Sequence, residues 1–168
     1  MDAETAGRGT FLVSKLAIPY LSKSANPHIL MLSPPLDLDP RWFAPHVAYT
    51  ISKFGMSLCV LGLAEELRPR GIAVNALWPR TMIATAAIAN VIGGPELMQR
   101  CRHPAIVADA AYHVLTAPSR DLTGRFLIDE DFLRERGVVD FELYRVDPSL
   151  PLQPDFFVPG TLPLREVR

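Results

Sequence analysis

Two short, almost uninterrupted apolar runs constrain this chain most, because they flank a long stretch with helical periodicity. Residues 28–33 and 72–78 are rich in aliphatic side chains, which is typical of strands covered on both faces of a parallel sheet. Between them, apolar residues recur with helical spacing over residues 46–68, until Pro69 and Gly71 end the pattern. The sequence therefore predicts a strand, a helix and a second parallel strand, which is a βαβ unit.

Weaker patterns extend this unit on both sides. Apolar residues with helical spacing precede the first strand, and a run that begins at Thr123 and Gly124 predicts a third short strand. The fold class expected is therefore α/β. The further predicted elements are helices over residues 5–22, 86–91, 96–100, 104–117 and 131–136 and a strand over residues 123–129.

Composition excludes several classes of protein. With 168 residues, 49% of them hydrophobic and 21% charged, the chain is predicted to form one globular domain. Its net charge of −1 and dispersed basic residues argue against a nucleic-acid partner. Charged residues interrupt the longest apolar runs, and the chain does not begin with a basic segment followed by an apolar one. We therefore expect no membrane partner and a cytoplasmic protein.

Cysteine and histidine residues give no sign of a metal site. Cys59 and Cys101 lie far apart, which predicts free thiols in a reducing compartment rather than a disulfide. The four histidines, His28, His46, His103 and His113, lack the spacing of metal ligands.

Tyr49 and Lys53 are the strongest candidates for catalytic residues. Their spacing places them one above the other on one face of the predicted helix, where the ammonium can approach the phenol. A nearby cation favours the ionised phenol, so its pKa would move from about 10 toward the range in which general acids and bases work. The alternative for such a pair is a partly buried tyrosine beside a solvated lysine.

Together, these features give the chain a resemblance to the short-chain dehydrogenase/reductase family. The matching features are Ser33 at a strand end, the Tyr49 and Lys53 pair, residues 75–79 closing the next strand, and residues 123–126. Residues 33–36, 42–43, 48–51, 93–95, 109–112 and 152–157 are similar, more narrowly, to the hydroxysteroid dehydrogenase-like branch. The resemblance covers about residues 8–158. It implies a Rossmann-like, doubly wound parallel sheet, of which this chain holds the last three strands.

The resemblance also implies catalytic roles. Tyr49 would exchange a proton with the oxygen of an alcohol or carbonyl substrate, and Ser33 would donate a hydrogen bond to that oxygen. Lys53 would lower the pKa of Tyr49 and hold the nicotinamide ribose. A fourth polar residue of the family, an asparagine, is replaced by Ala6.

The cofactor implied is NAD or NADP. Pro79, Ile83 and Thr85 match the family's loop beside the nicotinamide, with the Ile83 backbone and the Thr85 hydroxyl at its carboxamide. Tyr49 and Lys53 would complete this end of the cofactor site. Arg80 stands where the family usually has glycine, which reduces the backbone freedom of the loop.

The sequence contains no Gly-x-x-x-Gly-x-Gly loop to bind pyrophosphate with backbone donors at a helix N-terminus. The resemblance therefore implies that residues 1–144 are the C-terminal part of a dehydrogenase domain, that the N-terminal cofactor-binding half is absent, and that cofactor binding is weak or absent. Residues 145–168 hold five prolines and predict an extended arm or linker, with the aromatic residues of 152–157 as its docking candidate.

Two functions follow as hypotheses. The first is an N-terminally truncated NAD(P)-dependent oxidoreductase acting on an alcohol/carbonyl pair. The second is an inactive fragment that serves as an interaction or dimerisation module. The predicted helices over 5–22 and 46–68 match those that form the family's dimer interface, and the strand over 28–33 lacks an inner neighbour, so we expect a homo-oligomer of poor solubility.

Overall fold

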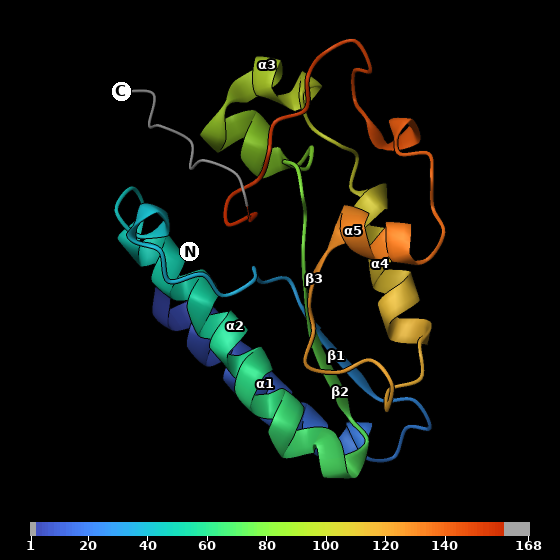
Figure 1. The fold of residues 1–168 in the computed structure, drawn as a ribbon. Helices are drawn as coiled ribbons and strands as arrows, with labels where there is room; N and C mark the ends of the chain where they lie inside the picture. Colours follow the sequence, from blue (N-terminus) through green and yellow to red (C-terminus); the bar gives the residue numbers. More distant parts are fainter. Residues whose placement is uncertain (1–2, 160–168) are drawn as a thin grey trace.

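Three parallel strands lie at the centre of the computed structural model, which describes residues 3–159 (Figure 1). They are β1 (His28–Met31), β2 (Ala73–Trp78) and β3 (Phe126–Ile128), in the order β1-β2-β3. Ala76 of β2 lies opposite Met31 on one side and Phe126 on the other. This arrangement confirms the α/β class and the partial Rossmann-like sheet.

Helices cover both faces of the sheet (Figure 1). The long helices α1 (Ala3–Leu21) and α2 (Val47–Leu67) pack on one face, and α4 (Ala105–Thr116) and α5 (Asp129–Glu135) pack on the other. The remaining helical pieces are α3 (Gly94–Gln99), a π-helix (Ile88–Ile92) and three 3-10 turns (Pro40–Trp42, Arg68–Arg70 and Glu142–Tyr144).

The β2 strand organises the core because all six of its residues are buried. Its side chains alternate between the two faces, as a strand requires. Val74 and Ala76 pack with the apolar side of α2, whereas Leu77 packs with α4 and α5. The polar member, Asn75, donates to the carbonyl of Leu122 at 2.8 Å and accepts from a backbone N–H, so its burial is compensated.

Several predicted boundaries shift. The strand expected over 28–33 ends at Met31, because the Ser33 N–H turns back to the Met31 carbonyl at 3.0 Å before the two prolines. The strand expected over 123–129 is shorter, since Asp129 already begins α5. The helix expected over 86–91 is largely the π-helix.

By length and composition alone, α2 with the turn that follows could cross a membrane: residues Val47–Arg70 contain a window with a mean hydropathy of 1.5. Its buried residues include Phe54, Val60 and Leu67, which belong to the clusters packed on the sheet. A central helix of a sheet-containing core meets the same test.

Residues 151–158, which we name the C-terminal strap, dock onto the domain. The Gln153 carbonyl accepts from the Met82 N–H at 2.9 Å, and the Asp155 N–H donates to the Arg80 carbonyl at 3.1 Å. Phe157 and Val158 are 2% and 0% exposed. These residues therefore pack as part of the folded unit. The division into residues 1–144 and 145–168 stays a prediction, and residues 160–168 of the predicted tail lie outside the described residues.

Candidate active site

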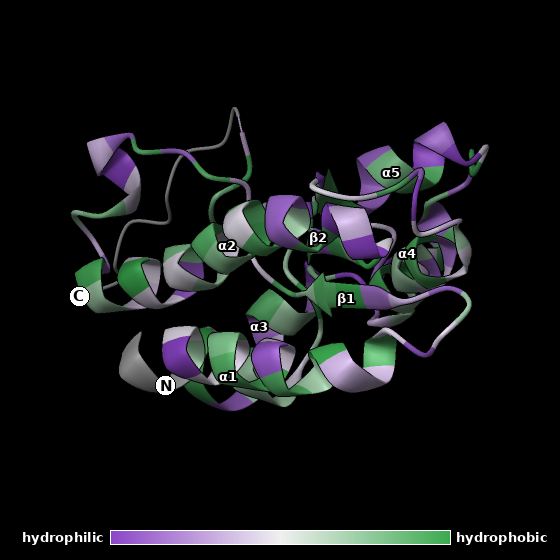
Figure 2. Ribbon diagram, turned by 90° about the horizontal axis from the view of Figure 1, so that it is seen from below, coloured by the Kyte–Doolittle hydropathy of each residue, from purple (hydrophilic) through white to green (hydrophobic). Residues whose placement is uncertain are grey.

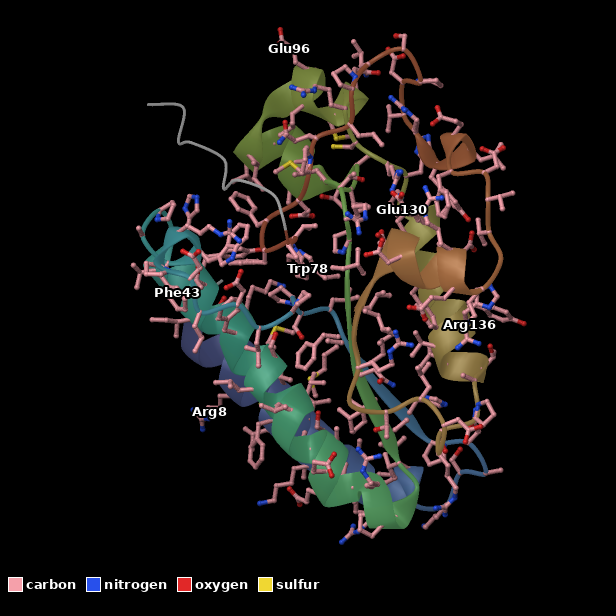
Figure 3. All side chains as sticks on the ribbon, viewed as in Figure 1. Arg8, Phe43, Trp78, Glu96, Glu130 and Arg136 are labelled. Atoms are coloured by element: carbon pink, nitrogen blue, oxygen red, sulfur yellow. The ribbon has the colours of Figure 1, made fainter. Side chains whose placement is uncertain are left out.

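A cavity of about 1010 Å³ opens beside the carboxyl ends of the strands, where open α/β sheets bind their ligands. Trp78 at the end of β2 lies between α2 and the strap, and its indole N–H donates to the Phe156 carbonyl at 2.7 Å (Figure 3). Most of the lining is apolar, which suits an apolar ligand. The lining residues include Leu32, His46, Tyr49, Lys53, Pro79, Ile83, Thr85 and Asp155.

Tyr49 and Lys53 both line this cavity from α2. The Tyr49 ring stacks on Phe157, with ring centroids 5.9 Å apart, and Tyr49 keeps 38% of its surface exposed. The Lys53 ammonium donates to the Leu32 carbonyl at 3.3 Å and lies 5.1 Å from the centre of the Trp78 ring. The helix thus aims both polar groups at one space.

Burial, rather than Lys53, controls the titration of Tyr49 in this structure. Desolvation raises the pKa of Tyr49 to about 12, and the negative charge of Asp155 adds to the effect. Desolvation also lowers the pKa of Lys53, an effect that Asp155 opposes. The expected lowering of the Tyr49 pKa is therefore wrong for this structure, because helical spacing alone says nothing about burial.

Ser33 lies beside the cavity and is held from both sides by α2. Lys53 bonds the carbonyl of the preceding residue, Leu32, while the Ser57 hydroxyl donates to the carbonyl of the following residue, Pro34, at 2.7 Å. Ser33 itself is 0% exposed, and its hydroxyl has no hydrogen-bond partner within residues 3–159. It is absent from the cavity lining, so the structure places it next to the candidate site rather than on its wall.

The loop after β2 brings Pro79, Ile83 and Thr85 to the cavity wall. Backbone bonds on either side fix the loop: the Ala84 N–H donates to the Arg102 carbonyl at 2.8 Å, and the Arg102 N–H donates to the Met82 carbonyl at 3.0 Å. This bridge leaves the N–H and C=O of Ile83 without a hydrogen bond inside the described part of the chain. A carboxamide, which offers one donor group and one acceptor, matches such a pair.

Arg80, which replaces the usual glycine, is held by contacts of its backbone and of its side chain. Its backbone N–H donates to the Asp129 carboxylate at 2.8 Å, and its guanidinium pairs with Asp131. The path of the loop is therefore fixed by contacts to α5 rather than by glycine.

Asp155 is the functional candidate that the sequence alone did not reveal. It lines the same cavity, and its burial raises its pKa to about 7. The neighbouring aromatics were recognised as a docking segment, but no spacing relates the strap to α2. His46, which lacks the spacing of a metal ligand, also lines the cavity.

The comparisons with known proteins agree with this geometry. The family model described as Enoyl-(Acyl carrier protein) reductase matches residues 3–114. This chain belongs to the short-chain dehydrogenase/reductase family. A crystal structure of a short chain dehydrogenase from Mycobacterium thermoresistibile is 50% identical with a TM-score of 0.84, over 94% of this chain and 56% of that one.

Two curated relatives of this chain share the name hydroxysteroid dehydrogenase-like protein 2. The Danio rerio protein is 58% identical over 91% of this chain and 36% of its own length. The Homo sapiens protein is 54% identical over 90% of this chain and 35% of its own length. The chain thus spans about a third of the length of these relatives. The general family match ends before β3, α5 and the strap.

Proposed function

We propose that the chain belongs to an NAD(P)-dependent oxidoreductase that interconverts an alcohol and a carbonyl. The observation that carries this proposal is the convergence of Tyr49 and Lys53 with Pro79, Ile83 and Thr85 on one apolar cavity. An acid/base group and a free backbone amide in one largely apolar space suit a reaction in which hydride and proton transfers must exclude water.

In this proposal the Tyr49 hydroxyl exchanges a proton with the substrate oxygen, and Lys53 places a positive charge beside it. The buried, unpartnered hydroxyl of Ser33 supplies a second donor once a substrate oxygen approaches the end of β1. The nicotinamide cofactor, when bound, supplies or accepts the hydride.

The residues present fit the nicotinamide end of the cofactor. The free N–H and C=O of Ile83 and the hydroxyl of Thr85 would hold the carboxamide, and Lys53 would hold the ribose. The sequence supplies no Gly-rich loop for the pyrophosphate. We therefore expect weak binding of the dinucleotide by this chain.

The substrate class follows from the cavity wall. Its aliphatic and aromatic lining favours a bulky, largely apolar alcohol or ketone, because each buried CH₂ group contributes about 0.8 kcal/mol. The carboxylate of Asp155 in the same wall disfavours an anionic substrate.

Cofactor binding and turnover test this proposal separately. We expect NAD or NADP at saturating concentration to raise the melting temperature, because a ligand that binds the folded state stabilises it by mass action. Tyr49→Phe should lower any turnover of an alcohol substrate by about 100-fold or more, whereas Tyr112→Phe, 65% exposed on α4, should leave it unchanged. No shift with either cofactor, or full turnover by Tyr49→Phe, would contradict the proposal.

One observation favours the second hypothesis, an association module. Helices α1 and α2, which lie side by side (Figure 2), carry a band of exposed apolar residues. Surfaces of this kind mark protein interfaces. The exposed members are Phe11, Leu12, Val13, Leu16 and Tyr20 of α1 and Ile51, Leu58 and Leu61 of α2.

We propose that this band forms the contact of a homo-oligomer. Val13→Glu combined with Leu61→Glu should yield a smaller particle in sedimentation equilibrium, because the two positions are 70% and 53% exposed in the free chain and would place charges in the contact. Val139→Glu, 85% exposed after α5, is the matched control. A monodisperse monomer before mutation would refute the contact.

A further inference from the structure

The first turn of α5 is bonded to the loop after β2 and to the segment beside that loop. This turn carries three consecutive carboxylates, Asp129, Glu130 and Asp131. Asp129 accepts from the Arg80 N–H at 2.8 Å, and Asp131 pairs with the Arg80 guanidinium. Glu130 (Figure 3) pairs with Arg102, with 2.5 Å between Oε2 and Nη1. The chain thus connects the loop to α5 through two arginines, one within the loop and one beside it.

The backbone of Arg102 joins this loop to the segment that leads to the strap. On one side it forms a parallel bridge with Ile83. In that bridge the Arg102 N–H donates to the Met82 carbonyl at 3.0 Å, and the Ala84 N–H donates to the Arg102 carbonyl at 2.8 Å. On the other side Arg102 forms an antiparallel bridge with Arg145. A shift of Arg102 would therefore move Ile83 as well.

The side chains of Arg102 and Glu130 form a buried ion pair. They keep 6% and 13% of their surfaces exposed. The Arg102 guanidinium lies 5.7 Å from the centre of the Phe141 ring, and Arg134 pairs with the other oxygen of Glu130 at 2.8 Å. Removing one partner of a buried pair leaves a poorly solvated charge without compensation, which is strongly destabilising. The pair therefore holds the Arg102 segment against α5.

A second ion pair of α5 offers a contrast. Arg125 and Glu135 are joined by two hydrogen bonds of 3.0 Å each, but their side chains are 46% and 50% exposed. Exposed pairs contribute little to stability, because water and salt screen their charges. Neither residue lines the cavity. Loss of this pair should therefore leave the loop after β2 unchanged.

We propose that Arg102 is a positioning residue, and that its ion pair with Glu130 holds Ile83 at the cavity wall with the Ile83 N–H and C=O unbonded. Glu130 acts through Arg102, and neither residue touches the reacting atoms. The assignment of a nicotinamide carboxamide to Ile83 rests on the proposed function, whereas the ion-pair tether itself does not.

Amide hydrogen exchange, followed by NMR, tests the tether without a cofactor. In Arg102→Met, the amides of residues 84 and 102 should exchange about tenfold faster or more, because the segment loses the pair that holds it. The Ala73 amide, bonded to the Pro27 carbonyl at 3.0 Å, is the internal reference for a general loss of stability. If residues 84 and 102 accelerate no more than Ala73, the proposal is overturned.

The matched control is Arg125→Met, which makes the same substitution in the exposed pair and should leave the rates at residues 84 and 102 unchanged. Glu130→Gln decides the matter if Arg102→Met fails to fold, because it keeps the size of the side chain and removes its charge. It should accelerate the same two amides, and Glu135→Gln should not. Unaltered rates in folded Glu130→Gln also overturn the proposal.

Nicotinamide mononucleotide, which carries the carboxamide and one ribose phosphate, tests the consequence for the site. It should shift the ¹⁵N–¹H signal of Ile83 in the unmodified chain. In Glu130→Gln its dissociation constant should rise about tenfold, the effect of losing roughly one well-placed hydrogen bond. An unchanged constant would remove the positioning role. No shift in the unmodified chain would instead remove the nicotinamide assignment of the proposed function, and hydrogen exchange would still decide the tether.

Discussion

The helix α2 and the C-terminal strap both line one cavity, but they are held in place in different ways. The backbone of α2 is satisfied by its own helical hydrogen bonds over Val47–Leu67. The strap has no such internal ladder: the Gln153 N–H donates to the Arg100 carbonyl and the Asp155 N–H to the Arg80 carbonyl. One wall of the site is therefore set by local sequence, and the other exists only once the loops around β2 have folded.

This difference predicts where the site is fragile. Local hydrogen bonds break one at a time at helix ends, whereas a segment held only by tertiary contacts is lost as a unit. Loss of the strap would remove Asp155 and Phe157 together and would leave Tyr49 and Lys53 on an intact α2.

The largest effect is expected for Phe157→Ala. Removing this 2% exposed ring leaves a cavity in the aromatic cluster and should lower the free energy of unfolding by about 3–5 kcal/mol. Urea denaturation measures the loss. The two tryptophans, Trp42 and Trp78, lie 5.6 and 6.0 Å from the Phe157 ring, so their fluorescence should also change in the folded state.

The matched control for Phe157→Ala is Leu143→Ala. That side chain is 79% exposed on the segment that leads to the strap, so its loss should change the free energy of unfolding by less than about 0.5 kcal/mol. If Phe157→Ala were equally mild, the strap would not be an integral wall of the site.

The same comparison explains what the sequence could predict. The bounds of α2 and β2 lie within one residue of the predicted 46–68 and 72–78, because helical periodicity and an apolar run are local signals. Tyr49 and Lys53 were found for the same reason. Asp155 was missed because its role depends on the bridge between Pro154 and Thr81, which no local pattern encodes.

Electrostatics shows the same limit. The i, i+4 spacing correctly places Tyr49 and Lys53 on one cavity, but the direction of the Tyr49 pKa shift depends on how deeply the strap and the Phe157 ring bury it. Sequence spacing therefore predicts which groups meet, and tertiary packing determines how they titrate.

A second prediction concerns pH. The pKa of Asp155 rises from its ordinary 3.8 to about 7 in the folded state, so the folded chain binds the proton more tightly than the unfolded chain. Its contribution to stability is therefore fully present below about pH 4 and is lost as the pH rises toward 7. We expect a decrease of about 1–3 kcal/mol from this group, measured by urea denaturation between pH 4 and 8.

Asp155→Asn isolates this contribution, since Asp129, whose pKa rises to about 6, acts in the same direction. The decrease between pH 4 and 7 should be smaller in Asp155→Asn than in the unmodified chain, and Asp121→Asn should reproduce the unmodified profile. Identical profiles for Asp155→Asn and the unmodified chain would show that the carboxylate is not buried by the strap in solution.

The smallest effect distinguishes contacts within α2 from contacts across to β1. Ser52 and Ser57 are both fully buried on this helix, but the Ser52 hydroxyl donates to the Tyr49 carbonyl of its own helix and the Ser57 hydroxyl to the Pro34 carbonyl across the fold. Ser57→Ala should cost about 1 kcal/mol, because it leaves a buried carbonyl without this donor. Ser52→Ala should be nearly neutral, since the Tyr49 carbonyl still accepts its backbone hydrogen bond within α2. Thermal denaturation of the two variants, equal in composition, measures the difference. Equal losses would mean that the loop carrying Ser33 is positioned by β1 itself rather than by α2.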